Sequence, residues 1–356
     1  MFRKVTLTGI LTTMALLTAA CGGGGSESAG PGEDPKETLV VVDWGGAVTE
    51  ARKDTIFKPF EEKFGVNIEV ESPTDYGKFK AMVEGGNVNW DVVNVDTFWA
   101  EQAGKQGLVE PIDYKIVDKE HILPEMANEY SVGAEMYSSV IAYSTEAFSE
   151  DQHPKTWEDF WNVDKFPGAR GLYNSAYETL EIALLADGVK PEDLYPLDID
   201  RAFKSLDKLA AKTEIVWWDA GAQPVELLSS GTVTVSTAWN GRITEAKKDN
   251  VPVDLHYNQA TLASESWAIP KGSKNKELAM EFINFATSAE VQAAFSETID
   301  YSPVNQKAIE LLPAEVQERL GQSPELAKTQ VIMDPVYWAE HYDEVSERLQ
   351  EWHLKQ

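Results

Sequence analysis

The regular alternation of strand-like and helix-like segments, which begins at Thr38, limits the possible fold more than any other feature. Apolar, β-branched runs at 38–44 and 90–96 predict buried strands. Between them, residues 48–64 carry apolar side chains at helical spacing. Strands separated by helices are typical of an α/β sheet with mainly parallel pairing. Because 356 residues suffice for two ordinary domains, we expect two α/β lobes and a helical C-terminal region.

The N-terminal residues have the pattern of an export signal. Arg3 and Lys4 precede a short run of apolar and small residues that ends at Cys21, the only cysteine of the chain. The run is too short and too rich in threonine for a membrane-spanning helix. The segment Leu-Thr-Ala-Ala-Cys at 17–21 resembles a bacterial lipobox, although Thr18 stands where leucine is usual. We therefore expect residues 1–20 to be a signal peptide and Cys21 to be lipidated, with simple cleavage nearby as the alternative.

A glycine-rich segment follows the cysteine. Residues 21–37 contain Gly, Ser, Pro and acidic residues and almost nothing that a core would bury. This composition predicts a flexible tether between a lipid anchor and a globular body. The expected location is therefore the periplasm or the outer face of the membrane, with the lipid as the only membrane attachment.

Charge and cysteine content exclude several classes of function. The formal net charge is −28, which repels nucleic acid and favours encounter with cations, although solubility in a salty medium explains it equally well. A single cysteine permits no internal disulfide and no multi-cysteine metal site, and the five histidines never pair at metal-ligand spacing. We expect no metal and no cofactor.

Enzyme signatures are missing from the sequence. We find no Gly-x-Ser-x-Gly elbow, no His-Glu-x-x-His motif and no cysteine available as a nucleophile in the body of the chain. A secreted hydrolase with paired carboxylates is therefore strongly disfavoured. A surface adhesin or a partner of a sensor remains a minor alternative to a transport receptor.

Several landmarks together resemble the spermidine/putrescine-binding proteins of bacterial ABC importers. The match runs from about residue 38 to the end, and its most specific segments are 264–270 (Ser-Glu-Ser-Trp-Ala-Ile-Pro), 238–242 (Ala-Trp-Asn-Gly-Arg), 91–96 and 301–305. The resemblance implies the two-lobed type II periplasmic-binding-protein fold, an α/β architecture in which each lobe is a mainly parallel sheet flanked by helices. It further implies a ligand cleft at the hinge and a monomer that docks on ABC permease subunits.

The resemblance also suggests how the chain divides. We expect lobe 1 to comprise residues 38–143 plus 267–318, and lobe 2 to comprise 144–266 plus 319–356. Family ligand sites are boxes of aromatic rings with acidic ends, because a ligand ammonium gains cation–π attraction from the rings and a charge-assisted hydrogen bond from a carboxylate. The residues that match such a site here are Trp44, Asp96, Phe98, Ser175, Glu178, Trp218, Trp239, Glu265 and Tyr301.

Each candidate also has an ordinary structural explanation. Asp96 is placed to cap the following helix, and Glu178 would lie in a helix first turn, where a negative charge is favourable. Glu265 matches the acid that grips an ammonium in the family, but it would equally suit a strand edge. Ser175 stands where the family has a second acid, so one negative charge is missing.

Arg242 is the most informative departure from the family pattern. A guanidinium offers a planar fork suited to a carboxylate, whereas a polyamine site gains nothing from a buried cation. If Arg242 faces the cleft, the site suits a zwitterion such as γ-aminobutyrate, with its carboxylate on Arg242 and its ammonium on Glu265. The alternative is that Arg242 pairs with Glu245 or Asp219 outside the cleft. Family membership keeps a polyamine as the first interpretation and the zwitterionic amine as the second.

Overall fold

The computed structural model describes residues 36–356. The expected signal peptide, Cys21 and nearly all of the tether lie outside the described residues. The described strands are β1 (Thr38–Val42), β2 (Asn67–Glu71), β3 (Val92–Asp96), β4 (Val132–Ser144), β5 (Arg170–Tyr173), β6 (Ile215–Trp218), β7 (Val235–Trp239), β8 (Val253–Ala268), β9 (Ser302–Pro303) and β10 (Val331–Ile332).

Helices fill most of the chain between the strands. They are α1 (Gly46–Arg52), α2 (Lys58–Phe64), α3 (Tyr76–Glu84), α4 (Thr97–Lys105), α5 (Trp157–Trp161), α6 (Ala176–Ala186), α7 (Ile199–Ala210), α8 (Gln223–Ser229), α9 (Asn240–Lys248), α10 (Lys276–Ala286), α11 (Ala289–Thr298), α12 (Gln306–Leu311), α13 (Ala314–Gln317) and α14 (Pro335–His353). Three short helical turns complete the set: η1 (Lys53–Phe57), which is π-helical and joins α1 to α2, η2 (Pro124–Met126) and η3 (Pro191–Asp193).

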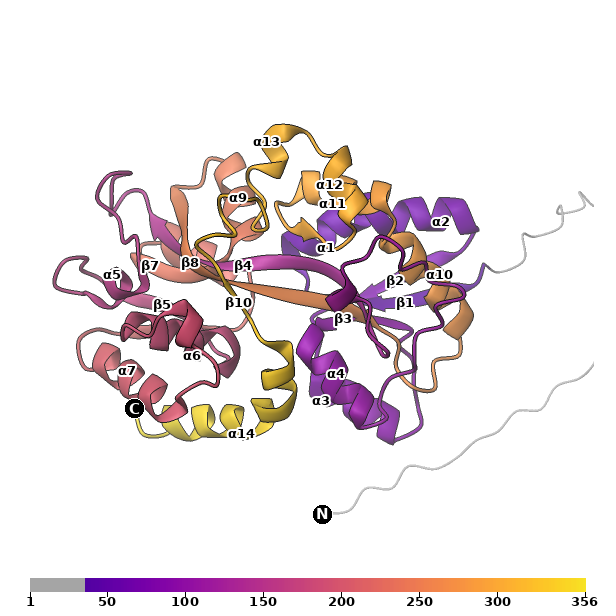
Figure 1. Cartoon of the computed structure of the whole chain (residues 1–356), viewed down its shortest axis with the longest axis horizontal. Helices are drawn as coiled ribbons and strands as arrows, with labels where there is room; N and C mark the ends of the chain where they lie inside the picture. The colour runs from indigo at the N-terminus through magenta and orange to yellow at the C-terminus, as the bar shows by residue number, and fades with distance from the viewer. Residues whose placement is uncertain (1–35) are drawn as a thin grey trace, which may run out of the picture. The chain divides into compact units, whose positions relative to one another are not determined.

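One mixed sheet runs through the described residues, in the order β2-β1-β3-β8-β4-β7-β5-β6. The pairs at its two ends are parallel: β1 with β2 and β3, and β5 with β6 and β7. The central pairs β3–β8, β8–β4 and β4–β7 are antiparallel. The long strands β4 and β8 lie side by side across the middle of the body (Figure 1). They join the two groups of parallel strands, because β8 pairs with β3 and β4 pairs with β7.

The sequence pattern predicts the parallel α/β units but underestimates the central pair. The helix over 48–64 is confirmed, and its apolar stripe packs Phe57 and Phe60 against Phe282 of α10 at ring-centroid distances of 6.0 and 5.3 Å. The central strand β8 runs without interruption from Val253 to Ala268. Its first half contains polar residues of intermediate burial, which obscure the strand signal in the sequence.

Other local features follow from ordinary helix chemistry. Thr156 caps α5 by accepting a hydrogen bond from the backbone N–H of Asp159 at 3.0 Å. Among residues 36–356, no helix combines the length and apolar character that crossing a membrane requires. By contacts, Glu37–Gln356 form a single compact unit, and the division into two lobes stays a prediction.

Gln292 of α11 fixes the segment that carries Tyr301 to the central strands. Its side-chain amide donates to the carbonyl of Ala134 on β4 at 2.7 Å, and its oxygen accepts from the backbone N–H groups of Val304 and Asn305 at 2.9 and 2.8 Å. The side chain is buried. Three backbone groups that water cannot reach therefore depend on one amide.

We expect Gln292→Leu to lower the free energy of unfolding by about 3 kcal/mol, because buried backbone groups lose their partners at roughly 1–3 kcal/mol each. Glu297→Leu, at an exposed position of the same helix, is the matched control and should change the stability by less than about 0.5 kcal/mol. Chemical denaturation followed by circular dichroism measures both. Equal effects of the two variants would contradict the anchoring role of Gln292.

Candidate functional site

The candidate site lies where the parallel strands of both ends of the sheet finish. In open α/β sheets the carboxyl ends of parallel strands are the usual position of ligands. Here these ends supply the candidate residues: Trp44 just after β1, Asp96 at the end of β3, Tyr173 at the end of β5, Trp218 at the end of β6 and Trp239 at the end of β7. Contacts between rings and between charged groups bring most of the residues suggested by the sequence close to one another.

Three aromatic rings from one end of the sheet form a compact group. Tyr173 stacks on Trp218 with ring centroids 4.6 Å apart and an interplanar angle of 25°. Trp239 meets both rings edge-on, at 5.4 Å from Tyr173 and 5.3 Å from Trp218. Tyr137 of β4 extends the group, at 5.7 Å from Trp239 and 5.9 Å from Tyr301. The structure thus brings Trp218, Trp239 and Tyr301 together through two tyrosines, Tyr137 and Tyr173, that sequence reasoning missed.

A row of three acids crosses the middle strands. In the antiparallel register, Glu265 of β8 lies opposite Asp96 of β3 on one side and opposite Glu135 of β4 on the other. Residues directly opposite each other share a face of the sheet at close range. Asp96, Glu265 and Glu135 therefore form one acidic row, and like charges so close need positive partners.

Asp96 is the end of this row that faces the aromatic side chains. The hydroxyl of Tyr76 donates to its carboxylate at 2.6 Å, and the ring of Tyr76 lies 6.1 Å from that of Trp44. Burial raises the pKa of Asp96 to about 6. Asp96 precedes α4 but makes no side-chain capping hydrogen bond, so the capping interpretation is wrong. Among residues 36–356, no salt bridge involves Asp96.

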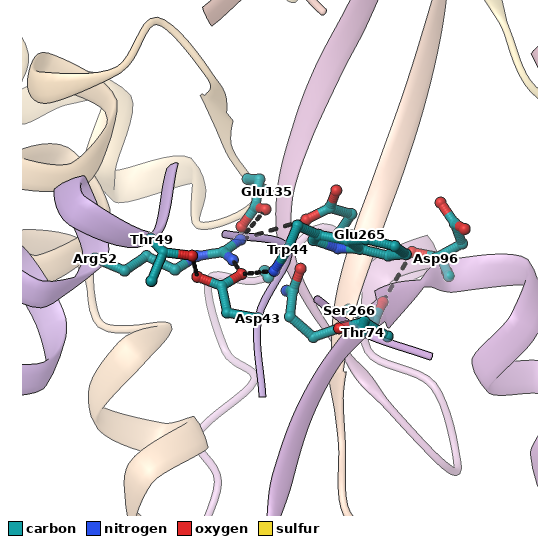
Figure 2. Close-up of polar contacts among 12 residues, drawn as sticks. Asp43, Trp44, Thr49, Arg52, Thr74, Asp96, Glu135, Glu265 and Ser266 are labelled. Carbon is teal, nitrogen blue, oxygen red and sulfur yellow. Dashed lines mark hydrogen bonds and ion pairs between the residues drawn. The ribbon is translucent and has the colours of Figure 1, made fainter. Parts of the chain in front are cut away.

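Glu265 and Glu135 share a buried arginine. The guanidinium of Arg52, on α1, forms ion pairs with Asp43 and Glu135, and its Nη2 atom lies 3.3 Å from Glu265 Oε2. Figure 2 shows Glu265 between this arginine and Asp96. Burial raises the pKa of Glu265, repulsion by Glu135 raises it further, and the attraction of Arg52 opposes both. Glu265 is therefore already engaged by a protein cation, which the sequence-based interpretation did not foresee.

Glu178 has an unusual backbone conformation, and its carboxyl group accepts three hydrogen bonds. Its φ of 71° and ψ of −49° interrupt α6, so the expected position in a regular helix first turn is wrong. Tyr137 donates to its carboxyl group at 2.8 Å and Trp239 at 3.3 Å, and Ser139 donates as well. Burial raises the pKa of Glu178 to about 8.

Arg242 is buried against the turn that follows β1. Its Nη2 atom donates to the carbonyl of Gly45 at 2.9 Å, and its Nε atom is buried without a hydrogen-bond partner. A Cβ atom on Gly46 would stand 2.9 Å from Arg242 Nη1, and Gly45 and Gly46 both have positive φ. Only glycine meets both demands without strain.

The alternative pairings of Arg242 are not observed. Glu245 pairs with Lys248 at 2.5 Å, and Asp219 accepts from the amide of Asn174 at 2.9 Å. In the part of the chain that the structure describes, no carboxylate forms a salt bridge with Arg242. The charges of Arg242 and Glu265 both act on the hydroxyl of Tyr301, where they have opposite effects on its pKa.

A comparison with the other fully buried arginines makes Arg242 stand out. Arg52 has three acidic partners, although its Nε atom, like that of Arg242, is buried without a hydrogen-bond partner. Arg170 donates from all three of its nitrogens to backbone carbonyls, among them those of Phe160 and Gly168, both at 2.7 Å. Arg242 is only 5% exposed and has a single carbonyl. A buried guanidinium of this kind has donors to spare for an anionic ligand.

Two of the sequence candidates have other neighbours. Phe98 is buried and packs against Tyr177 and, on α14, Tyr342, with centroids 4.6 and 4.8 Å apart. Ser175 is the N-cap residue of α6 and makes no side-chain capping bond. The structure thus places Phe98 in a packed aromatic cluster at the C-terminal helix.

The residues that sequence reasoning missed had weak signals. Tyr173 ends a strand run as Trp218 does, and Asp43 directly precedes Trp44. Arg52 and Glu135 gave no signal, because their pairing depends on the register of β4 with β8 and on the packing of α1. Within residues 36–356, no group of three or more His, Cys, Asp or Glu side chains is arranged to hold a metal ion.

Comparisons with known proteins agree with this geometry. Residues 55–326 match the family model described as bacterial extracellular solute-binding protein. The γ-aminobutyric acid-binding protein of Pseudomonas aeruginosa is 40% identical over 323 residues, which cover 89% of this chain and 91% of that protein. Spermidine/putrescine-binding periplasmic protein 1 of Haemophilus influenzae is 25% identical, over 88% of this chain and 86% of that protein.

A solved structure gives the same answer at the level of the fold. The structure described as the Atu4243-GABA receptor superimposes with a TM-score of 0.80 at 41% identity, and the match covers 90% of this chain and 98% of that one. The agreement confirms the expected α/β fold of type II periplasmic binding proteins. These relatives are solute-binding receptors rather than enzymes. The chain therefore belongs to the bacterial extracellular solute-binding proteins of ABC importers.

Proposed function

We propose that this receptor captures a zwitterionic ω-amino acid of the γ-aminobutyrate class. The observation that carries the proposal is Arg242, a buried cation with a free Nε donor and no acidic partner among residues 36–356. A carboxylate would satisfy this guanidinium through charge-assisted hydrogen bonds. The relatives named for γ-aminobutyric acid, at 40 and 41% identity, support the same ligand class.

We assign the ammonium group of the ligand to the acidic row formed by Asp96, Glu265 and Glu135. Arg52 compensates Glu135 and Glu265, whereas Asp96 has no cationic partner among residues 36–356. An ammonium between Asp96 and Glu265 would relieve the repulsion across β3 and β8. The proposed ammonium site therefore consists of Asp96 and Glu265 together rather than Glu265 alone, with Trp44 beside it (Figure 2).

The aromatic group supplies the walls between the two charged ends. Trp239 and Tyr301 connect the neighbourhood of Arg242 to that of the acids, since a Cβ atom on Gly221 would stand 2.7 Å from the Trp239 ring and 3.0 Å from Arg242 Nε. These rings would cover the methylene groups of a short ω-amino acid and exclude water.

A polyamine, the first interpretation from the sequence, becomes the second candidate; relatives at 25–27% identity are named for spermidine and putrescine. Against it stands the cost of a second ligand ammonium beside Arg242, which like-charge repulsion in a buried site makes unfavourable. Arg242 is therefore expected to disfavour a diamine in this site.

We expect Arg242→Gln to weaken γ-aminobutyrate binding about 100-fold or more, roughly 3 kcal/mol, because the ligand carboxylate loses its charged partner. Isothermal titration calorimetry on the full receptor measures the change. Arg348→Gln removes an arginine that pairs with Asp200 on the surface, and this control should bind as the wild type does. Wild-type protein that binds putrescine but not γ-aminobutyrate would refute the proposal.

The pH dependence of binding follows from Asp96. Its pKa is raised to about 6 in the ligand-free protein, and an ammonium binds the ionised carboxylate. Affinity is therefore complete well above pH 6 and falls as the pH drops through 6, approaching about tenfold per pH unit below it. Titrations between about pH 5 and pH 8 test this, and Asp96→Asn should reduce the slope near pH 6 while lowering the affinity throughout. An affinity that rises on acidification would contradict the assignment.

We further propose that the body works as two lobes, 38–143 plus 267–318 and 144–266 plus 319–356, which close on the ligand and dock as a monomer on the permease. Arg242 of α9 contacts Gly45 before α1, so this hydrogen bond would join the lobes. Closure of this kind is driven by contacts that form only in the closed state.

Attachment by a lipid at Cys21 is also proposed, from the lipobox-like segment and the glycine-rich tether. We expect Cys21→Ser to shift the protein from the membrane fraction to the soluble extracytoplasmic fraction while leaving ligand affinity unchanged. Fractionation with immunoblotting measures this. A Cys21→Ser protein that stays with the membrane would disprove anchoring through this residue.

A further inference from the structure

A buried cation, Arg52, pairs with Glu135 and Glu265, two of the three acids of the acidic row. Asp43, Glu135 and Glu265 reach Arg52 from the end of β1, from β4 and from β8, respectively (Figure 2), and Arg52 and Asp43 are fully buried. Such a cluster is costly to desolvate, and the loss of one of its partners destabilises the fold. Two of its acids belong to the acidic row, so the cluster also affects the charge of the proposed site.

The surroundings hold the Arg52 guanidinium in one place. It lies over the rings of Trp267 and Phe295, at 4.9 and 5.4 Å from their centroids. Asp43 is also saturated, because it accepts from Thr49 at 2.6 Å and from its neighbour's backbone N–H at 2.8 Å. The cation is thus fixed at one end of the acidic row.

Glu265 connects this cation to the ligand site. It lies between Glu135 and Asp96 in register, and one of its oxygens is 3.3 Å from Arg52. The row consequently has a compensated end at Arg52 and an uncompensated end at Asp96. One position for a positive charge is filled by the protein, and one is left for a ligand.

We propose that Arg52 is a specificity-determining residue, which acts through Glu265 and limits the site to one ligand ammonium. This inference rests on the proposed function, because it explains why a zwitterion is preferred to a diamine. Arg52 itself does not touch the ligand in this scheme. It withdraws part of the negative charge that would otherwise attract a second amine, and Arg242 repels that amine at the other end.

The test compares two ligands of similar length, γ-aminobutyrate and putrescine, by calorimetry on wild-type protein and variants. Arg52→Met should lower the preference for γ-aminobutyrate over putrescine about tenfold or more, because removal of a buried positive charge favours the ligand with the higher positive charge. Arg52→Lys keeps the charge and should retain the wild-type preference. Circular dichroism and thermal unfolding report whether each variant is folded.

Arg52→Gln serves if the methionine variant does not fold, since its amide can still donate to the acids, and the same direction of change is expected. In a Glu265→Gln background, Arg52→Gln should shift the preference much less, because the connecting acid has lost its charge. A purely structural role would weaken both ligands equally in every variant, and that result would overturn the inference.

The two proposals fail in different ways. Wild-type protein that prefers putrescine would refute the zwitterion assignment, whereas the shift between wild type and Arg52 variants would still be measurable. Wild-type protein that prefers γ-aminobutyrate, with a preference that does not change in Arg52→Met or Arg52→Gln, would leave the function intact and refute the role of Arg52.

Discussion

The pairing of β4 with β8 is the constraint on which the rest of the structure depends. These two strands, of 13 and 16 residues, run antiparallel along each other and carry a parallel group of strands at either end. Side chains of a strand alternate between faces, so Glu135, Tyr137 and Ser139 of β4 share a face. On that face, Glu135 lies opposite Glu265 at one end, and Ser139 lies opposite Trp239 at the other. One register thus brings acids and rings from both ends of the sheet into a single site.

Charge balance within that site follows from the hydrogen-bond and ion-pair partners of each buried arginine. Arg170 is satisfied by carbonyls and serves the local fold. Arg52 is neutralised by acids, although its Nε atom has no hydrogen-bond partner, and it leaves the row with an uncompensated end. Arg242 is satisfied only in part. A ligand with one positive and one negative group would complete both unfinished partnerships at once, whereas a diamine would complete one and oppose the other. The zwitterion is therefore favoured by complementarity at two ends.

The sequence predicted the parts of this arrangement that depend on local pattern. Residue runs such as 90–96 and 48–64 have clear periodicity, and resemblance placed Trp44, Trp239 and Tyr301 in the site. It could not predict the partners of Glu265, because these depend on strand register and on a helix that approaches from another part of the chain. Arg52 carries no signal of its own, since an arginine in an amphipathic helix is usually on the solvent face. The first half of β8 was missed for a related reason, as its polar residues hide a strand that is paired but half-exposed.

Glu178 shows how the acids of one site take different roles. A non-glycine residue with φ of 71° costs about 1–3 kcal/mol and persists only where its surroundings determine it fully. Here the determinants are Tyr137, Ser139 and Trp239, which all donate to its carboxyl group. With a pKa raised to about 8, Glu178 is mainly neutral at pH 7 and does not compete with Asp96 for an ammonium. Its strained backbone instead aims a neutral acceptor at the edge of Trp239 and holds that ring in the wall. In the proposed site, the negative charge available to a ligand ammonium is thereby left to Asp96 and Glu265, which lie opposite each other in strand register.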